Sequence, residues 1–311
     1  MGKFVLKRLL AMIPVILGIT FIIYTILELS PGDPAVAILG ETATEADLNA
    51  LRLKMGLNDP YIVRYFKYIL NAVQGNFGIS YRTGLSVVDE LMARLPYTFI
   101  LALFGVGFAT IIGVPIGIVS AVKQYTVTDN VITAAAMIMC SVPPFWLSLM
   151  LMMLFSLKLG WFPAIGVDSW RNFVVPILAM AIGNMATMIR TTRSMMLEVI
   201  REDYIRTARA KGATEKVVVF KHALRNAILP VITQVGISFG FQLGGAMVCE
   251  TVFSIPGLGN LIITSVRQKD IPMVMGAIIF VAVAISLVNL LMDIVYTWVD
   301  PRLKSTKKAV G

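Results

Sequence analysis

Long apolar runs follow one another along most of the chain and are separated by short polar segments. A helix needs about 20 apolar residues to cross the roughly 30 Å of hydrocarbon in a bilayer. Six runs of about this length occur, near residues 9–29, 97–122, 130–157, 173–190, 229–250 and 273–297. The pattern predicts an all-α integral membrane protein with six transmembrane helices.

The first apolar run has two interpretations. Lys3, Lys7 and Arg8 precede it, as basic residues precede the core of a secretory signal peptide. However, the run is longer than a typical signal core, and the turn at 30–34 (Ser-Pro-Gly-Asp-Pro) follows it in place of a small-residue cleavage site. We therefore expect a retained helix, and the count of six depends on this choice.

Composition supports the membrane assignment, and charge orients the helices. Apolar residues make up 57% of the 311 and charged residues 14%, and the mean hydropathy is +0.80. If both termini are cytoplasmic, the inside segments carry 17 Lys and Arg against 6 Asp and Glu, and the rest of the chain carries 10 against 12. This bias follows the positive-inside rule. The net charge of +9 therefore reflects membrane topology, and no nucleic-acid partner is expected.

The polar segments divide the chain into four expected parts. They are an N-terminus with the first helix, an extracytoplasmic cap, a core with five transmembrane helices and a cytoplasmic tail, at 1–29, 30–96, 97–297 and 298–311. Gly and Pro residues punctuate the cap and leave two helical patterns, near 44–55 and 60–73. The core includes one long polar segment, 193–228, on the cytoplasmic side.

No residue pattern points to catalysis or to a metal site. Cys140 and Cys249 are far apart and lack a CxxC partner, and His222 is the one histidine of the chain. No phosphate-binding loop, GxSxG or HExxH sequence is present. Asp293 and Glu250 lie near the ends of their runs, which disfavours a proton relay. An ion-coupled transporter and a membrane enzyme are therefore the weaker alternatives.

The fifth run carries a face of small residues. Gly236, Gly240 and Gly244 recur every fourth residue, so they stack on one side of a helix and allow another helix to approach closely. We expect a helix contact there, with a helix of this chain or of a partner.

The segment "DYIRTARAKGATEKVVVFKHALRNAILP", residues 203–230, is the most polar stretch of the chain. On a helix from 197 one face is largely apolar and the other charged, with Leu197, Ile200, Tyr204 and Ala208 opposed to Glu198, Glu202, Asp203, Arg206 and Arg209. Gly212 suits a helix end with positive φ and Thr214 an N-cap, so a second helix with Val217 and Phe220 is expected to follow. From the residues alone, this pair of helices either lies on anionic lipid or docks on a second protein.

The same segment resembles the cytoplasmic loop of binding-protein-dependent ABC importer permeases, whose pattern is Glu-Ala-Ala, three residues, Gly and a later Leu-Pro. The matching positions are Arg206, Thr207, Ala208, Gly212, Leu229 and Pro230. Arg206 replaces the usual Glu, and the spacing from Gly212 to Pro230 is longer than in the common form. Both departures resemble the peptide/nickel branch. Further similar stretches span nearly the whole chain: "KRLL", "PGDP", "GNFGIS", "LGWFP", "ETVFSIPGLG" and "DPRL".

The resemblance implies a type I ABC importer permease fold and the role of the B-type subunit in dipeptide, oligopeptide, glutathione or nickel import. It implies a bacterial cytoplasmic membrane protein that binds no cofactor, with ATP and Mg on partner subunits. The implied partners are a homologous C-type permease subunit, two ATP-binding subunits, an extracytoplasmic substrate-binding protein and membrane lipid. The implied ATPase-coupling residues are Leu197, Ile200, Asp203, Tyr204, Arg206, Ala208, Arg209, Lys211 and Gly212. Asn184 and Gln242 are the candidate residues of the transport pathway.

Overall fold

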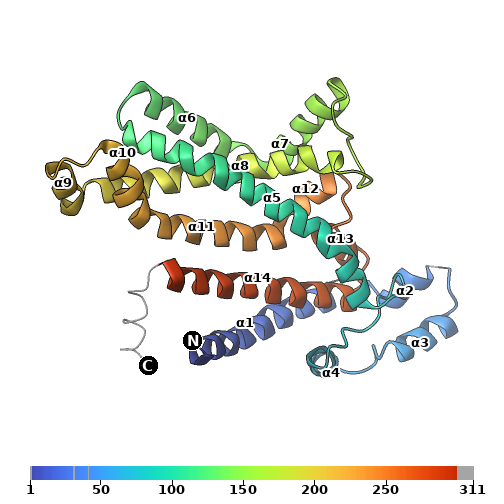
Figure 1. Cartoon of the computed structure of the whole chain (residues 1–311). Helices are drawn as coiled ribbons and strands as arrows, with labels where there is room; N and C mark the ends of the chain where they lie inside the picture. Colours follow the sequence, from blue (N-terminus) through green and yellow to red (C-terminus); the bar gives the residue numbers. More distant parts are fainter. Residues whose placement is uncertain (1, 31, 41, 300–311) are drawn as a thin grey trace. The chain divides into compact units, whose positions relative to one another are not determined.

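The computed structural model describes residues 2–30, 32–40 and 42–299, and these residues are almost entirely helical. The tail expected at 298–311 lies outside the described residues from 300 onward. In chain order the helices are α1 (Gly2–Leu29), α2 (Pro34–Leu39), α3 (Glu45–Lys54), α4 (Tyr61–Val73), α5 (Val87–Val122), α6 (Val127–Ser141), α7 (Pro144–Leu151), the π-helix η1 (Met152–Lys158), α8 (Arg171–Ile200), α9 (Asp203–Ala210), α10 (Glu215–Val217), the π-helix η2 (Val218–Ala223), α11 (Leu224–Gly245), α12 (Met247–Val252), α13 (Leu258–Arg267) and α14 (Ile271–Val299) (Figure 1).

Five helical spans are long and apolar enough to cross a membrane: α1, α5, α8, the run from α10 to α11, and α14. The predicted third span is not one straight helix, because α6 and α7 are bent by 98° where the chain passes Val142 and Pro143. The proline ring disfavours helical geometry in the residue before it, and Val142 accordingly has ψ 123°. Counting this pair as one span gives the six spans that the sequence predicts.

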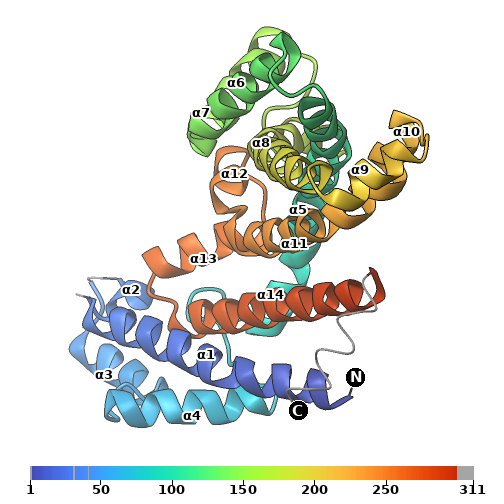
Figure 2. The same ribbon diagram turned by 90° about the vertical axis from the view of Figure 1, so that its left-hand side faces the viewer.

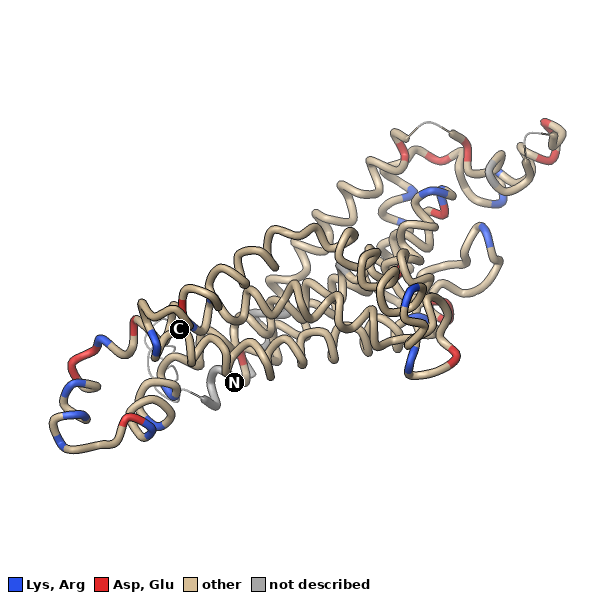
Figure 3. The backbone as a smooth tube through the Cα atoms, turned by 90° about the horizontal axis from the view of Figure 1, so that it is seen from above, with Lys and Arg blue, Asp and Glu red and all other residues tan. Residues whose placement is uncertain are grey.

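Most charged side chains lie near the ends of the long helices (Figure 3), and Arg190 of α8 is an exception because it lies ten residues before the end of its helix. An ionised group at the centre of a bilayer costs at least about 2–3 kcal/mol, so this distribution is the one a membrane-spanning helix requires.

The chain forms two compact units. The first comprises residues 1–98 and 256–286, and the second comprises residues 99–255 and 287–311, so α5 and α14 contribute to both. In the first unit, the bounds of α3 and α4 agree to within one residue with the helical patterns predicted at 44–55 and 60–73. Asp33 begins α2 by accepting the backbone N–H of Ala35 and pairs with Arg52 of α3 at 2.6 Å. This pair fixes the first two short helices to each other.

Asp270, which precedes α14, organises the loop between α4 and α5. Its carboxylate is 2% exposed and accepts hydrogen bonds from the Ser80 hydroxyl and from the backbone N–H groups of Tyr81, Arg82 and Met273. The bond from Met273 caps the start of α14, and the others hold residues 80–82 against it.

Replacing Asp270 with alanine is therefore expected to destabilise the first unit. The buried Ser80 hydroxyl and the buried N–H of Met273 lose their acceptor, which costs about 2 kcal/mol, and the thermal unfolding midpoint measured in detergent should fall. Asp59→Ala is the matched control, because Asp59 pairs with Lys67 where both side chains are largely exposed and such pairs contribute at most about 1 kcal/mol. Equal midpoints for the two variants would contradict this role of Asp270.

In the second unit α8 packs against α5, α6, α7 and α11 (Figure 2). Two glycines of α5 allow this helix to approach α8 closely. A Cβ added at Gly113 would lie 2.9 Å from Cβ of Met188, and one added at Gly117 would lie 2.7 Å from the carbonyl oxygen of Ile189. Any larger residue at these positions would separate the two helices.

Candidate functional site

The short helix α9 lies beside the joined ends of α8 and α11 (Figures 1 and 2). The single amphipathic helix expected from residue 197 is wrong in its boundaries, because α8 continues to Ile200 and the chain turns at Arg201 and Glu202 before α9 begins. Leu197 and Ile200 therefore belong to the last turn of α8. The fourth span also extends ten residues beyond the predicted end at 190.

Ile205 anchors α9. Its side chain is fully buried in an apolar cluster that also contains Ile118 and Ala121 of α5, Met196 of α8, Val218, Val219 and Ala223 of η2, and Ala227 of α11. Leu197 and Ile200 pack against the same cluster from the end of α8. The cluster joins α9 to four other helical segments, so a movement of α9 is transmitted to the spans against which Ile205 packs.

Gly212 ends α9 as the sequence predicts, with φ +83°. Its N–H donates to the carbonyl of Arg209 at 2.9 Å, and the N–H of Ala213 donates to the carbonyl of Ala208 at 3.2 Å. These two bonds form a Schellman motif, which favours glycine at the position with positive φ. Thr214 occupies the N-cap position of α10 with an extended backbone, but its side chain makes no capping hydrogen bond.

The second helix of the polar segment is not separate from the fifth span. Helix α10 passes directly into η2 and then into α11, so a single helical run extends from Glu215 to Gly245 with Pro230 inside it. Between α10 and α11 the run takes the wider π-helical form of η2, and such turns are frequent at functional sites. A displacement of α9 thus acts directly on the fifth span.

Two side-chain contacts connect α9 to the helical run that follows. Arg209 forms a two-bond fork with Glu215, at 2.7 and 3.2 Å, across the Gly212 turn. This hydrogen bond raises the pKa of the Arg209 guanidinium above its ordinary value. Asn226 of α11 donates to the Tyr204 hydroxyl at 2.8 Å.

The outer face of α9 remains available to another molecule. Asp203, Arg206 and Lys211 are exposed, and Ala208 is half-buried. Arg206 contacts Asp203 at 3.5 Å rather than the Glu202 carboxylate four residues before it. Tyr204, expected on the apolar face, is 42% exposed, and its hydroxyl accepts the hydrogen bond from Asn226.

An ion pair that sequence reasoning missed fixes α6 to α8. Arg193 makes two hydrogen bonds to Asp129, at 2.7 and 2.8 Å, and Asp129 also accepts from the Ser120 hydroxyl and from the Tyr125 N–H. The Asp129 side chain is 2% exposed and that of Arg193 is 26% exposed. The two residues are 64 positions apart, so no local sequence pattern identifies the pair.

The remaining candidate residues lie within the second unit. Asn184 is half-buried and donates to the carbonyl of Met180 on its own helix. Gln242 is 5% exposed, and its amide oxygen would lie 3.1 Å from a Cβ added at Gly105 of α5. Their place in a transport pathway stays a prediction.

The small-residue face of α11 contacts another helix of this chain at one position. A Cβ added at Gly236 would lie 2.4 Å from Cγ of Met292 in α14, so Gly236 admits the methionine side chain. Helix contacts at Gly240 and Gly244 stay predictions. Cys140 is exposed and Cys249 is buried. Within the described ranges, no group of three or more His, Cys, Asp and Glu residues is arranged to hold a metal ion.

Long apolar helices with one short polar helix fixed to their ends define a multi-pass membrane protein. The model described as "Binding-protein-dependent transport system inner membrane component" matches residues 113–305, and the model of the N-terminal part of such membrane components matches residues 1–102. The chain belongs to this family of inner membrane transport components.

Three curated relatives are similar over nearly the whole chain. The oligopeptide transport system permease protein AppB of Bacillus subtilis is 42% identical, and the match covers 98% of this chain and 100% of the relative. The dipeptide transport system permease protein DppB of Alkalihalophilus pseudofirmus is 40% identical, with 98% and 100% covered. The glutathione transport system permease protein GsiC of Escherichia coli strain K12 is 38% identical, with 98% and 99% covered.

A solved structure shares the fold. The inward-facing MetNI methionine ABC transporter has a chain that superposes with a TM-score of 0.57 at 19% identity, covering 68% of this chain and 97% of that chain. A second crystal form of the same transporter gives 0.59, with 68% and 96% covered. The type I permease fold expected from the sequence is confirmed.

Proposed function

We propose that this chain is the membrane permease subunit of an ATP-binding-cassette importer that carries peptides across the bacterial cytoplasmic membrane by alternating access. One observation carries the proposal: the similarity to AppB, DppB and GsiC extends over 98% of the chain, and all three names specify peptide or glutathione transport. These relatives support peptide cargo over the nickel or metal-chelate alternative.

Energy for transport has to come from other polypeptides. The sequence contains no phosphate-binding loop, so ATP and Mg are assigned to two partner ATPase subunits, and this chain acts without an ATPase site of its own. A homologous C-type permease subunit would complete the pathway, and an extracytoplasmic binding protein would deliver the peptide. Both termini are assigned to the cytoplasm by the distribution of Lys and Arg.

Helix α9 is the element through which the ATPase subunits would act. Its exposed residues Asp203, Arg206 and Lys211 would contact a groove of an ATPase subunit, and Ile205 would transmit the movement to the apolar cluster. A ligand shifts a conformational equilibrium only by its different affinity for the two states. Closure of the ATPase dimer by ATP would supply that difference, because α9 is fixed to the ends of two spans.

Reconstitution tests the proposal. The complex of this chain with its partner permease and ATPase subunits, in proteoliposomes with the binding protein present, is expected to accumulate radiolabelled trialanine only when ATP is supplied on the ATPase side. Omitting the binding protein should lower the rate to that of empty vesicles. Accumulation driven by a proton gradient without ATP would support the ion-coupled alternative and contradict the proposal.

A further inference from the structure

The least buried side of α8 is polar in its second half. Gly183, Arg190 and Ser194 are exposed and Thr187 is half-buried, and these positions recur every three to four residues, so they lie on one face of the helix. Asn184 and Thr191, both half-buried, flank this face. We call these six residues the α8 polar stripe.

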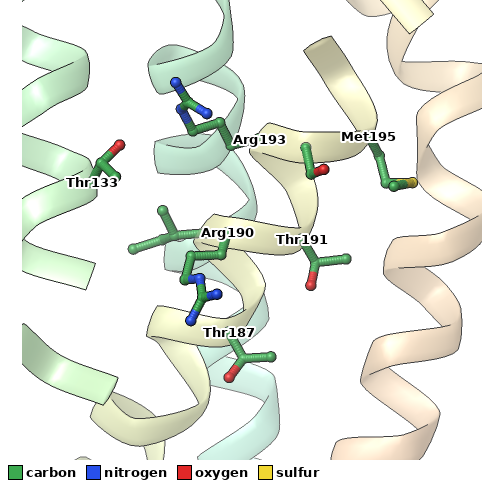
Figure 4. Close-up of a pocket in the computed structure, with 8 residues that line it drawn as sticks. Thr133, Thr187, Arg190, Thr191, Arg193 and Met195 are labelled. Atoms are coloured by element: carbon green, nitrogen blue, oxygen red, sulfur yellow. The ribbon is translucent and has the colours of Figure 1, made fainter. Parts of the chain in front are cut away.

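A cavity of about 560 Å³ opens beside this stripe (Figure 4). Its polar lining consists of Thr133 of α6 and of Thr187, Arg190, Thr191, Arg193 and Ser194 of α8. The cavity therefore presents hydroxyl groups and two guanidinium groups, and no carboxylate is among its lining residues in the described part of the chain. This composition suits an anionic ligand rather than a cation.

The two arginines of the cavity differ in their partners. The Arg193 charge is neutralised by Asp129 through two hydrogen bonds. Arg190, in contrast, is exposed. One of its guanidinium nitrogens lies 3.9 Å from the Cys140 sulfur, which is a weak acceptor. The Arg190 guanidinium thus keeps its charge and most of its N–H donors for a ligand, and in Figure 4 its side chain extends along α8 toward Thr187.

The extent of the stripe favours a transported molecule over a lipid headgroup. From Gly183 to Ser194 the stripe runs along α8 for 11 residues, which at about 1.5 Å per residue is roughly half the thickness of the hydrocarbon layer. A headgroup site requires polar groups only at the membrane surface. Polar residues deeper on a membrane helix face water or protein, so this side of α8 suits a water-filled route.

We propose that the α8 polar stripe lines the inner half of the transport pathway and that Arg190 binds the C-terminal carboxylate of the peptide cargo. This inference rests on the proposed function. A carboxylate is present at the C-terminus of every unmodified peptide, whatever its side chains, so one arginine serves cargo of varied sequence. A guanidinium binds a carboxylate through two parallel hydrogen bonds, and the open cavity lets the peptide leave.

Binding of trialanine and of its C-terminal amide tests this role of Arg190. The complete importer complex, without nucleotide and in phosphatidylcholine nanodiscs, is titrated with each peptide by NMR. The complex is expected to bind trialanine about tenfold more tightly than the amide, because only the acid offers a charge-assisted pair. Arg190→Gln should bind both peptides with the weaker affinity.

Arg201→Gln is the matched control, since Arg201 is an exposed arginine just after α8 and outside the stripe. It should keep the tenfold preference, and an unchanged thermal midpoint of Arg190→Gln should show that this variant is folded. Equal affinities for acid and amide in the unmodified complex, or an unchanged preference in Arg190→Gln, would overturn the inference. A parallel measurement in nanodiscs that also contain phosphatidylglycerol tests the lipid alternative. If Arg190→Gln loses phosphatidylglycerol binding and keeps the peptide preference, Arg190 belongs to a lipid site and the inference is overturned.

Measurements of peptide uptake distinguish a failure of this inference from a failure of the proposed function. If ATP-driven trialanine uptake is intact and the peptide preference does not depend on Arg190, only the pathway inference fails. If the unmodified complex with its binding protein takes up no peptide, the proposed function itself fails.

Discussion

Replacing Asp129 with alanine is expected to destabilise the second unit by about 3 kcal/mol and to lower its thermal unfolding midpoint in detergent more than any other single substitution considered for this chain. Breaking a buried ion pair from one side leaves the other charge uncompensated. Asp129 is 2% exposed, so its removal leaves Arg193 without a counter-ion and Ser120 and Tyr125 without their acceptor.

A double-mutant cycle separates the ion pair from the rest of this network. Asp129→Asn preserves the shape of the side chain and removes its charge, and Arg193→Gln removes the opposite charge. The double variant should be more stable than the sum of the two single losses predicts, with a coupling of about 1–3 kcal/mol. Additive losses would show that the pair contributes no interaction energy.

Gly212→Val is expected to reduce peptide transport per ATP hydrolysed at least about tenfold while leaving the chain inserted in the membrane. Gly212 has φ +83°, a conformation that a β-branched residue adopts only with strain. Apart from its two sequence neighbours, no described residue has an atom within 4 Å of a Cβ added at Gly212, so crowding within the described chain does not contribute. The strain would displace the turn that ends α9, and the added bulk would occupy space at the proposed docking face. Transport and ATPase rates measured on the same vesicles give the ratio.

Gly56→Val is the matched control. Gly56 follows α3 with φ +68°, and an added Cβ there also meets no atom within 4 Å. The backbone strain is therefore comparable, but the position lies in the first unit and far in sequence from α9. Gly56→Val should retain the transport ratio, and a ratio as low as that of Gly212→Val would show that general destabilisation explains both results. Gly212→Asn, which tolerates positive φ, should fall between glycine and valine.

The membrane helices could be predicted from the sequence because their cause is local. A run of apolar residues is a property of the segment itself, and five of the six runs lie on helices long and apolar enough to cross a membrane. The residues at which these helices begin and end are harder to predict from the sequence. Helix α5 begins at Val87, ten residues before the apolar run. The run does not mark this start, because the first turns of α5 include polar residues and pack within the first unit.

The polar segment shows where local patterns fail. Gly212 was correctly assigned, because a glycine after an amphipathic stretch is a local signal for a helix end. The turn at Arg201 and Glu202 contains neither glycine nor proline, so the sequence does not indicate a break there. A single helix from 197 therefore predicts Tyr204 on the apolar face. Ile205 became the buried anchor instead. At about 100° per residue, Ile205 lies about 160° around the helix from Asp203, so the charged Asp203 itself indicates that Ile205 faces inward.

The Arg193–Asp129 pair could not be predicted, since it depends on how α6 and α8 pack. In the sequence, Asp129 lies at the start of an apolar run and Arg193 lies in a polar stretch with Arg190, and neither position indicates a partner until the fold brings the two together. The same is true of Arg190, whose availability follows from the pairing of Arg193 with Asp129.

A structure of the assembled importer, determined without nucleotide and with ATP bound, tests the central claim most directly. The claim is that α9 connects a separate ATPase to spans that have no energy source of their own. We expect Asp203, Arg206 and Lys211 to contact an ATPase subunit in both states, with Ile205 remaining in the apolar cluster. If residues 203–210 contact only lipid or solvent in both states, the claim is contradicted.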